Sequence, residues 1–179
     1  MPAYEPRISA ELGFAWALSG RLDEAVPMVQ RAADEAAARK QTTSYSQVLL
    51  LLGEVSLLAG RLDEAADAAS RALDRFRRQG ERGHEAWALR LSGEIAARQS
   101  PSGAAEATAR YQAALTLASE LRMLPLAARC EFGLGRLFGQ AGQPERARPA
   151  LRRACTAFRE LEMSAELISA EAGLEGLSA

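Results

Sequence analysis

"GRLDEA" at Gly20–Ala25 occurs again, letter for letter, at Gly60–Ala65. Two further alanines continue this register, Ala107 in "SGAAEA" and Ala147 in "GQPERA". The anchor alanines Ala25, Ala65, Ala107 and Ala147 thus recur with a period of about 40 residues, which is the sequence signature of stacked structural units. We therefore predict a repeat protein with four units.

Two more small-residue positions keep the same register. An alanine follows each anchor alanine by seven residues, and a glycine precedes each anchor at a distance that changes only in the third unit, where "QSPSG" lengthens the turn. The alanines are Ala32, Ala72, Ala114 and Ala154, and the glycines are Gly13, Gly53, Gly93 and Gly135. Because a glycine inside a helix costs about 1 kcal/mol relative to alanine, we expect a neighbouring helix to cross closely at each of these glycines.

The hexapeptide has a physical meaning if each unit is a pair of helices. Gly20, Gly60 and Gly142 would each end a first helix in the left-handed conformation that glycine adopts at low cost. The acidic pair that follows, Asp23 and Glu24 in the first unit, would lie in the first turn of the second helix, where the helix dipole favours negative charge. The second helices are amphipathic, as in "LDEAADAASRALDRF", so their alanine side should pack against neighbours.

The predicted fold is therefore all-α, a right-handed superhelix of antiparallel helix pairs, that is, an α-solenoid of about nine helices forming one domain over residues 1–179. The expected helices span 6–19, 22–39, 43–59, 62–79, 83–99, 103–121, 125–141, 144–161 and 164–177. They form repeats at 6–41, 43–81, 83–122 and 124–162, with 164–177 as a C-terminal capping helix that places Gly173 at the repeat glycine. Pro27 and Pro149 fall inside second helices, so we expect a late helix start or a bend at each.

The repeat pattern resembles the tetratricopeptide repeat, which combines a Leu-Gly pair, an aromatic residue and an alanine followed by a large residue. The first unit has Leu12-Gly13, Trp16, Ala25 and Val29, and the fourth has Leu134-Gly135, Phe138, Ala147 and Leu151. The second and third units depart from it, with Ser56 and Ala96 in the aromatic position. The period of about 40 residues exceeds the usual 34, which implies longer helices or loops.

Three stretches over about residues 45–170 resemble a narrower group, the C-terminal tetratricopeptide region of large bacterial multidomain regulators. They are "GERGHEAWALRLSGEIAAR" (80–98), "ARYQAALTLASELRMLPLAARCEFGLGRLF" (109–138) and "ARPALRRACTAFRELEM" (147–163). In that group an adenylate/guanylate cyclase or DNA-binding domain precedes an ATPase module and the repeats. This chain contains no cyclase or ATPase motif, and no G-x-x-x-x-G-K-[ST] stretch, so a P-loop is excluded.

Composition limits the partners. Lys plus Arg is 22 against 23 acidic residues, for a net charge of -1, which disfavours broad electrostatic binding to nucleic acid or to an anionic membrane. The longest apolar run, Val48–Leu52, is too short to span a membrane, and the N-terminal stretch does not have the pattern of a secretory signal. We expect a soluble cytoplasmic protein in which Cys130 and Cys155 are buried free thiols.

The residues offer little for catalysis. His84 is the only histidine, so neither a His-based metal site nor a Ser-His-Asp triad is available within one chain. Adjacent carboxylates such as Asp23 and Glu24 point to different sides of a helix, and their position at a helix start already explains them. We expect no enzyme activity, no cofactor and no metal.

By comparison with the repeat fold, the first helix of each unit should line a concave binding face. The inward positions are Arg7, Ala10 and Phe14; Gln47, Leu50 and Glu54; Trp87, Arg90, Glu94 and Arg98; and Arg129, Phe132 and Arg136. Arginine and aromatic residues dominate interface hot spots, so an acidic or C-terminal carboxylate partner is one interpretation. In the other, Glu54 and Glu94 pair with the arginines as a solvated face. The lysine and asparagine of the carboxylate clamp in chaperone-binding relatives are replaced here by Ala10 and Phe14, which argues against that partner.

The predicted function is a non-enzymatic scaffold or regulatory domain that binds a protein or peptide through the concave face, or that associates with itself. A homodimer would use the first helix, where Phe14 and Trp16 lie on an end that no preceding repeat covers. The alternative function is a small-molecule or signal-peptide sensor domain of a bacterial regulator.

Overall fold

The structure, a computed structural model, describes residues 5–39, 42–99 and 103–177, and every regular element within these ranges is helical. The α-helices are α1 (Glu5–Leu18), α2 (Leu22–Ala38), α3 (Thr42–Leu58), α4 (Leu62–Gln79), α5 (Arg82–Gln99), α6 (Ala104–Glu120), α7 (Leu124–Gln140), α8 (Pro144–Glu160) and α9 (Ser164–Gly176). The predicted all-α class and the nine helical spans are confirmed, each boundary to within one residue. Residues 100–102 of the "QSPSG" turn lie outside the described residues.

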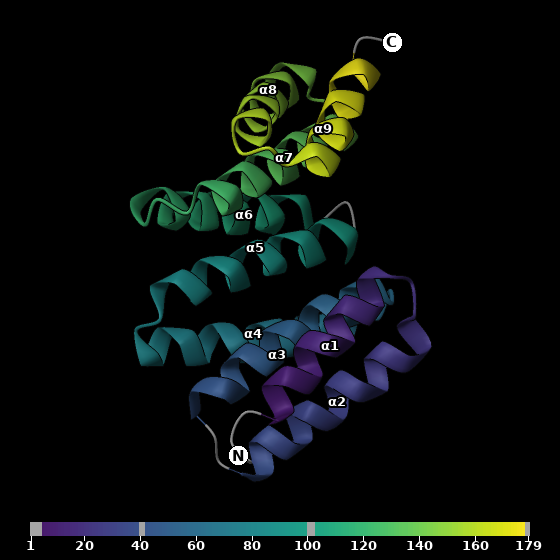
Figure 1. Ribbon diagram of the computed structural model, residues 1–179. Helices are drawn as coiled ribbons and strands as arrows, with labels where there is room; N and C mark the ends of the chain where they lie inside the picture. Colours follow the sequence, from purple (N-terminus) through teal and green to yellow (C-terminus); the bar gives the residue numbers. More distant parts are fainter. Residues whose placement is uncertain (1–4, 40–41, 100–102, 178–179) are drawn as a thin grey trace. The chain divides into compact units, whose positions relative to one another are not determined.

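The chain divides into two compact units, residues 1–91 and 92–179, and α5 runs through the boundary. In the first unit α1 pairs with α2 and α3 pairs with α4, and α3 packs against both α1 and α2 (Figure 1). One cluster of buried residues joins these helices, with Ala10 of α1, Val29 of α2 and Val55 of α3 among its members. The core of this unit therefore lies where one helix pair meets the next.

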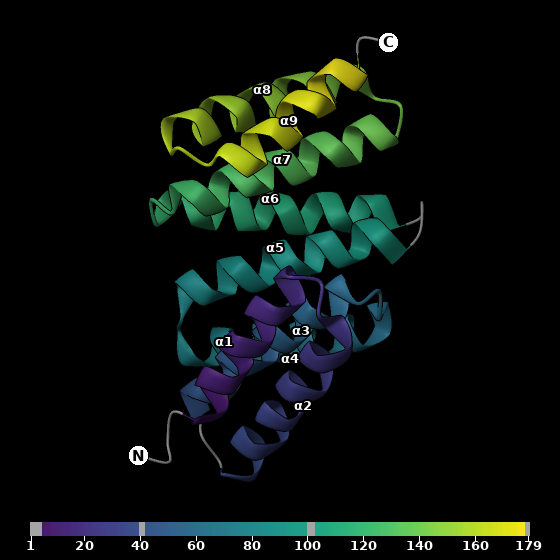
Figure 2. The same ribbon diagram turned by 45° about the vertical axis from the view of Figure 1, so that its right-hand side comes forward.

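In the second unit each helix packs against the next along the chain from α6 to α9, and α9 also touches α7 (Figure 2). Phe158 of α8, which is fully buried, joins Ala128 of α7 and Ala170 of α9 in one cluster. A second cluster surrounds Tyr111 of α6 with Leu134 and Phe138 of α7. Thus α9 packs on both helices of the α7–α8 pair.

The repeated hexapeptide is built as the sequence predicted. Gly20, Gly60 and Gly142 have φ of 84°, 74° and 66°, so each ends its helix in the left-handed region. The acidic residues after Gly20 and Gly60 lie in the first turn of α2 and of α4. The anchor alanines, Ala25, Ala65, Ala107 and Ala147, are each 0% exposed. The sequence reading missed an ion pair inside the hexapeptide, between Arg21 and Glu24 in the first copy and Arg61 and Glu64 in the second.

The repeat glycines lie where a first helix crosses its partner. A Cβ placed on Gly13 would be 2.5 Å from Cγ2 of Val29, and one on Gly93 would be 3.0 Å from Cγ of Tyr111. The contacting residue is the one four positions after the anchor alanine, in α2 and in α6 respectively. Since real Cβ atoms do not approach so closely, glycine lets the two helices come together at these points.

Gly173 does not occupy the repeat-glycine position that the sequence suggested. Arg122 lies in the turn before α7 and Glu162 lies in the turn before α9. They are the two described non-glycine residues with positive φ, and they lie one repeat period apart. Counted from these turns, Gly173 corresponds to Gly133, and Glu175 falls in the slot of Gly135. Gly173 accordingly faces Leu151 of the preceding helix α8, as Gly133 faces Tyr111 of α6.

The prolines do not delay their helices. α2 begins at Leu22 and α8 at Pro144, so Pro27 and Pro149 lie inside the helices. Of the two predicted outcomes, a late start or a bend, the late start is wrong. Neither proline is buried. The carbonyl group four residues earlier, which loses its helical donor at a proline, can therefore bond to water, and this lowers the cost of the proline.

Candidate binding surface

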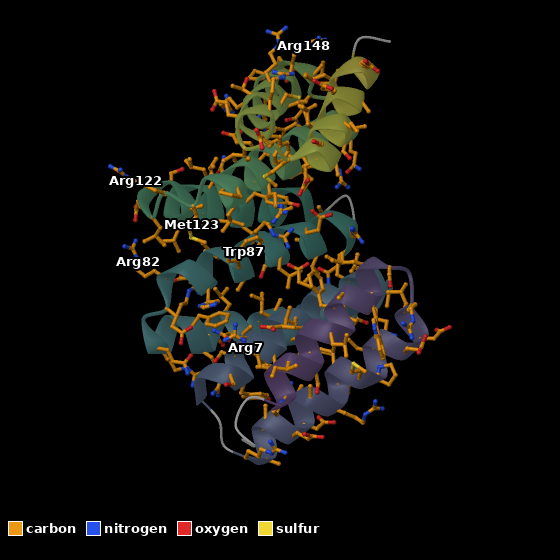
Figure 3. All side chains as sticks on the ribbon, viewed as in Figure 1. Arg7, Arg82, Trp87, Arg122, Met123 and Arg148 are labelled. Atoms are coloured by element: carbon orange, nitrogen blue, oxygen red, sulfur yellow. The ribbon has the colours of Figure 1, made fainter. Side chains whose placement is uncertain are left out.

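In the first unit, candidate residues from neighbouring first helices meet. The guanidinium of Arg90 on α5 pairs with the carboxylate of Glu54 on α3, and both side chains are largely buried. The same guanidinium lies over the ring of Trp87, 5.8 Å from its centroid; Trp87 is labelled on α5 in Figure 3. On the same two helices, the side-chain nitrogen of Gln47 lies 3.3 Å from Nε2 of His84.

In the second unit, Glu94 of α5 is the centre of a cluster that we call the Glu94 cluster: Glu94, Arg98, Tyr111 and Arg136. The buried Tyr111 donates a hydrogen bond to Glu94 Oε2 at 2.6 Å. Arg98 and Arg136 approach Glu94 Oε1 at 3.2 and 3.6 Å. Arg136 also lies over the ring of Phe132, at 5.6 Å. The cavity beside this cluster measures about 50 Å³, which is room for a water molecule or two but not for a larger ligand.

The next first helix continues the pattern. Arg129 of α7 donates to Glu166 of α9 at 2.7 Å. This hydrogen bond, which outweighs the opposing effect of burial, lowers the pKa of Glu166 from its ordinary value. Nothing in the sequence marks Glu166 as a partner of Arg129, because the contact depends on how α9 stacks on α7.

The candidate arginines thus contact carboxylates in the structure: Arg90 meets Glu54, Arg98 and Arg136 share Glu94, and Arg129 meets Glu166. In these pairs the glutamates balance the charge of the arginines. Arg98, Arg129 and Arg136 are half-exposed, and ion pairs of that kind contribute about 0–1 kcal/mol each. Such a pair can open at low cost when another carboxylate competes for the arginine.

The candidates on α1 are arranged differently. Arg7, labelled in Figure 3, forms its ion pair with Glu11 of the same helix, at 2.8 Å. Ala10 is fully buried in the core and cannot line a binding face. Phe14 and Trp16 pack against the first unit's core, and Arg21 covers the Trp16 ring at 4.3 Å. The two aromatic residues named for self-association are therefore partly buried in the chain's own packing.

The exposed apolar surface of α1 lies instead at Ile8, Leu12 and Leu18. Ile8 precedes the repeat glycine by five residues and is 60% exposed, whereas the residues five before the other repeat glycines, Val48, Ala88 and Cys130, are each 0% exposed. Val48 and its neighbour Leu52, the counterpart of Leu12, pack in one cluster with residues of α1 and α2. Ile8 and Leu12 thus occupy positions that a preceding helix pair covers in an internal repeat.

The remaining candidates have structural surroundings. His84 stacks on Phe76 with ring centroids 5.0 Å apart, and its Nδ1 lies 3.0 Å from a carboxylate oxygen of Glu81. Cys130 and Cys155 are free and buried, and burial raises the pKa of the Cys155 thiol. Among the described residues, no three or more His, Cys, Asp or Glu side chains gather as a metal site would require. None of the described helices combines the length and apolar character that a membrane span needs.

One further surface escaped the sequence analysis. On the other side of α7, a groove of about 400 Å³ is lined by Leu115 of α6, Leu124 of α7 and Leu161 after α8. At its edge Arg153 donates twice to the carboxylate of Glu131, at 2.7 and 2.9 Å. Turn residues near this groove, Arg122 and Met123, are labelled in Figure 3. Leu121 and Leu124, at the α6–α7 turn, are the residues in the sequence that could have indicated this apolar groove, but their exposure depends on how α8 packs.

Solved structures with the same arrangement of helices identify the fold. The chain is similar to a putative kinesin light chain of Podosopora anserina that has nearly identical TPR-like repeats. The form with one substitution matches at a TM-score of 0.76 and 14% identity, over 99% of this chain and 86% of that chain. The form without the substitution matches at a TM-score of 0.71 and 16% identity, over 99% of this chain and 96% of that chain. The fold is a tetratricopeptide-like helical repeat. BtubC (BKLC) from P. vanneervenii shares this repeat fold at a TM-score of 0.67 and 16% identity, over 99% of this chain and 87% of that chain.

No family model and no curated protein matches the sequence. At 14–16% identity, the solved structures establish the tetratricopeptide-like fold alone. Helical repeats of this kind generally serve as scaffolds for protein–protein interaction, with the stacked helices forming an extended binding surface.

Proposed function

We propose that the chain is a non-enzymatic scaffold that binds a protein or peptide partner through the concave face lined by its first helices. The observation that carries the proposal is the Glu94 cluster. It brings two half-exposed arginines from adjacent first helices to one carboxylate, beside the ring of Phe132. Arginine and aromatic side chains held in this way are typical of interface hot spots.

The partner that fits this surface is an acidic peptide. A carboxylate of the partner would replace Glu94 as the acceptor for Arg98 and Arg136, while Tyr111 keeps Glu94 in place by its hydrogen bond. The exchange conserves the number of ion pairs, so its net free energy is small for each arginine and several contacts must add up. Arg129 would take part in the same way by leaving Glu166.

Fluorescence anisotropy with a labelled polyglutamate peptide tests this proposal. We expect the wild-type chain to bind the peptide, to bind it more weakly as salt rises, and to lose affinity by about tenfold when Arg98 and Arg136 are both changed to Ala. The matched control is Arg110→Ala with Arg152→Ala. These arginines lie on second helices, and their loss changes the net charge by the same amount.

The control separates a binding site from general electrostatics. If the two double variants weaken binding equally, only net charge matters and the Glu94 cluster is not the site. If polyglutamate does not bind at any salt concentration, the acidic-partner proposal fails.

The biological setting that we propose is regulatory. The stretches 80–98, 109–138 and 147–163 resemble the C-terminal repeats of bacterial regulators, so the scaffold would act in the cytoplasm and transmit the binding of a protein partner to other domains. In the alternative function, a small-molecule or signal-peptide sensor, a ligand would occupy the same face. The cavity of about 50 Å³ beside the Glu94 cluster is well below the roughly 300 Å³ of ordinary ligand pockets, and so it favours the peptide.

Self-association is the second candidate function, and a different observation favours it. Ile8 and Leu12, one helical turn apart, form an exposed apolar patch on α1, and their counterparts in α3 are buried by a helix pair. Exposed apolar surface on the first helix of a repeat array is a site for a further partner. Light scattering over a concentration series tests this function, which fails if the chain stays monomeric up to about 1 mM.

A further inference from the structure

The last helix has an uncovered side that corresponds to a buried side of α7. Counted from the turns at Arg122 and Glu162, Ile168 corresponds to Ala128 and Ala172 to Phe132. In α7 these two positions face α8: Ala128 is buried in the cluster around Phe158, and the rings of Phe132 and Phe158 meet edge to face at 6.1 Å. In α9, Ile168 is 68% exposed and Ala172 is also exposed.

The uncovered sides of α1 and α9 lie at opposite ends of the series of repeats. In the described residues, α1 has the side on which a preceding helix would pack, and α9 has the side on which a following helix would pack. The counterpart of Ile8 in α9 is Ala170, which is 0% exposed because α9 itself lies on α7 and α8. The Ile168 side of α9 is therefore the side on which the second helix of a pair would pack, and the Ile8 side of α1 is the side on which a preceding pair would pack, so each end lacks one neighbour that an internal helix has.

They are also complementary in side-chain size. The α1 side presents the large aliphatic side chains of Ile8 and Leu12, whereas the α9 side presents Ile168 between the small residues Ala165, Ala172 and Gly176. Large side chains of one helix pack into the gaps left by small residues on another. On this side of α9 the charged residues are Glu171, which pairs with Arg159, and Glu175, and they lie beside the apolar residues that the contact would bury.

A direct contact between two first helices has a precedent inside the chain. α3 packs against α1 as well as α2, and α9 packs against α7 as well as α8. Val48 and Leu52 of α3 make their contact within the cluster that contains Ala10 and Ala17 of α1, so aliphatic residues on one helix lie among alanines of the other. The same combination is available between Ile8 and Leu12 of one copy and Ala165 and Ala172 of another.

We infer that the Ile8–Leu12 side of α1 binds the Ile168 side of α9 in a second copy of the chain, so that copies join head to tail. The inference rests on the self-association proposed above and names its two surfaces. Because the two surfaces differ, the interface is heterologous, and each copy can bind one neighbour through α1 and another through α9. One helix side is a small interface, so the assembly depends on concentration.

Two glutamate substitutions test the inference, measured by sedimentation velocity at concentrations up to about 1 mM. Wild-type chain should form species larger than a dimer as its concentration rises. Ile8→Glu and Ile168→Glu should each abolish assembly, because every contact needs one intact surface of each kind. An equimolar mixture of the two variants should form a dimer and nothing larger, since only one intact pair of surfaces remains.

The folded state and the specificity of the effect are checked separately. Both substituted positions are largely exposed, so circular dichroism should show unchanged helix content. Leu124→Glu, at another exposed leucine away from both ends, is the matched control and should assemble like the wild type. Loss of assembly in Leu124→Glu would overturn the inference, because the contact would then involve other surfaces.

The remaining outcomes distinguish the inference from the function on which it rests. If Ile8→Glu abolishes assembly but Ile168→Glu does not, self-association through α1 stands and the head-to-tail contact with α9 is wrong. If the equimolar mixture remains monomeric, the head-to-tail contact is also wrong. If wild-type chain is monomeric throughout, both the inference and self-association fail, while binding of polyglutamate to the Glu94 cluster is unaffected.

Discussion

Leu151 of α8 fills the space that a side chain on Gly135 of α7 would need. A Cβ on Gly135 would lie 2.6 Å from Cγ of Leu151 and 3.1 Å from its backbone nitrogen. The flexible side chain of Leu151 can turn away, but its backbone cannot. In the first, third and fourth units the repeat glycine and the large residue after the anchor alanine are therefore a matched pair. In the second unit that residue is Ala69, and Gly53 instead makes its closest approach to Leu91 of α5.

Gly135→Ala should lower the free energy of unfolding by about 1–3 kcal/mol, because the added methyl group forces α7 and α8 apart. Gly173→Ala is the matched control. Its Cβ would meet Leu151 at an ordinary contact distance of 3.4 Å, so the gain in helix propensity should stabilise the protein by up to about 1 kcal/mol. Urea unfolding measures both. Equal stability of the two variants would mean that the close contact at Gly135 has no energetic importance.

The left-handed turns give a second prediction. Gly60 has φ of 74° and open space around its Cα, so Gly60→Ala should destabilise by about 1 kcal/mol through backbone strain alone. Arg122→Gly and Glu162→Gly relieve the same strain at φ of 54° and 56° and should stabilise by about 0.5–1 kcal/mol. Thermal unfolding measures the changes. An unchanged Tm for Gly60→Ala, or a lower Tm for both glycine variants, would contradict this explanation.

The prolines inside helices α2 and α8 give a third prediction. Pro27→Ala and Pro149→Ala each restore a backbone donor inside a helix and should raise the free energy of unfolding by about 1–3 kcal/mol. Pro144→Ala is the control. Pro144 is the first residue of α8, where proline is well tolerated, so this change should have little effect or a small unfavourable one. If Pro27→Ala and Pro149→Ala behave like Pro144→Ala, the prolines cause no strain in the folded state.

Sequence reading succeeds where a position is determined by local geometry. Gly20 and Gly60 must adopt a positive φ, the residues after them must start a helix, and Ala25 and Ala65 must fit a close contact, so the helix boundaries follow directly. It is less successful with long side chains. The pairing of Glu54 and Glu94 with the arginines is one of the two interpretations of the sequence, but the contact between Arg129 and Glu166 is not, because it depends on how α9 stacks on α7 rather than on spacing in the sequence.

Two differences between the sequence predictions and the structure have the same origin. The sequence places Phe14 and Trp16 on an uncovered end, and in the structure both rings are partly buried against the first unit's core while Ile8 and Leu12 of the same helix are exposed. Its distance from Gly135 puts Gly173 near the repeat-glycine position, whereas the turn at Glu162 sets the register of α9. In both cases the residue types are informative, but the angular position of the helix decides which of them is covered.

The ion pair between Arg129 and Glu166 predicts a defined pH dependence. Arg129 holds the pKa of Glu166 below its ordinary value of 4.5 in the folded chain. A lowered folded-state pKa means that the pair stabilises the folded state fully above the unfolded-state value, and that this stabilisation is lost as the pH falls through the folded-state pKa. Glu166→Gln should therefore destabilise the protein at neutral pH, by less than about 1 kcal/mol because both side chains are partly exposed.

Urea unfolding of wild type and Glu166→Gln at neutral pH and at a series of acidic pH values measures this contribution. The difference in stability should shrink as the pH falls below about 4.5, because the protonated carboxyl and the glutamine amide then interact similarly with Arg129. Glu175→Gln, on the same helix and without an ion pair among the described residues, should match the wild type throughout. A difference for Glu166→Gln that stays constant with pH would show that lost packing, rather than the charge of Glu166, accounts for its effect.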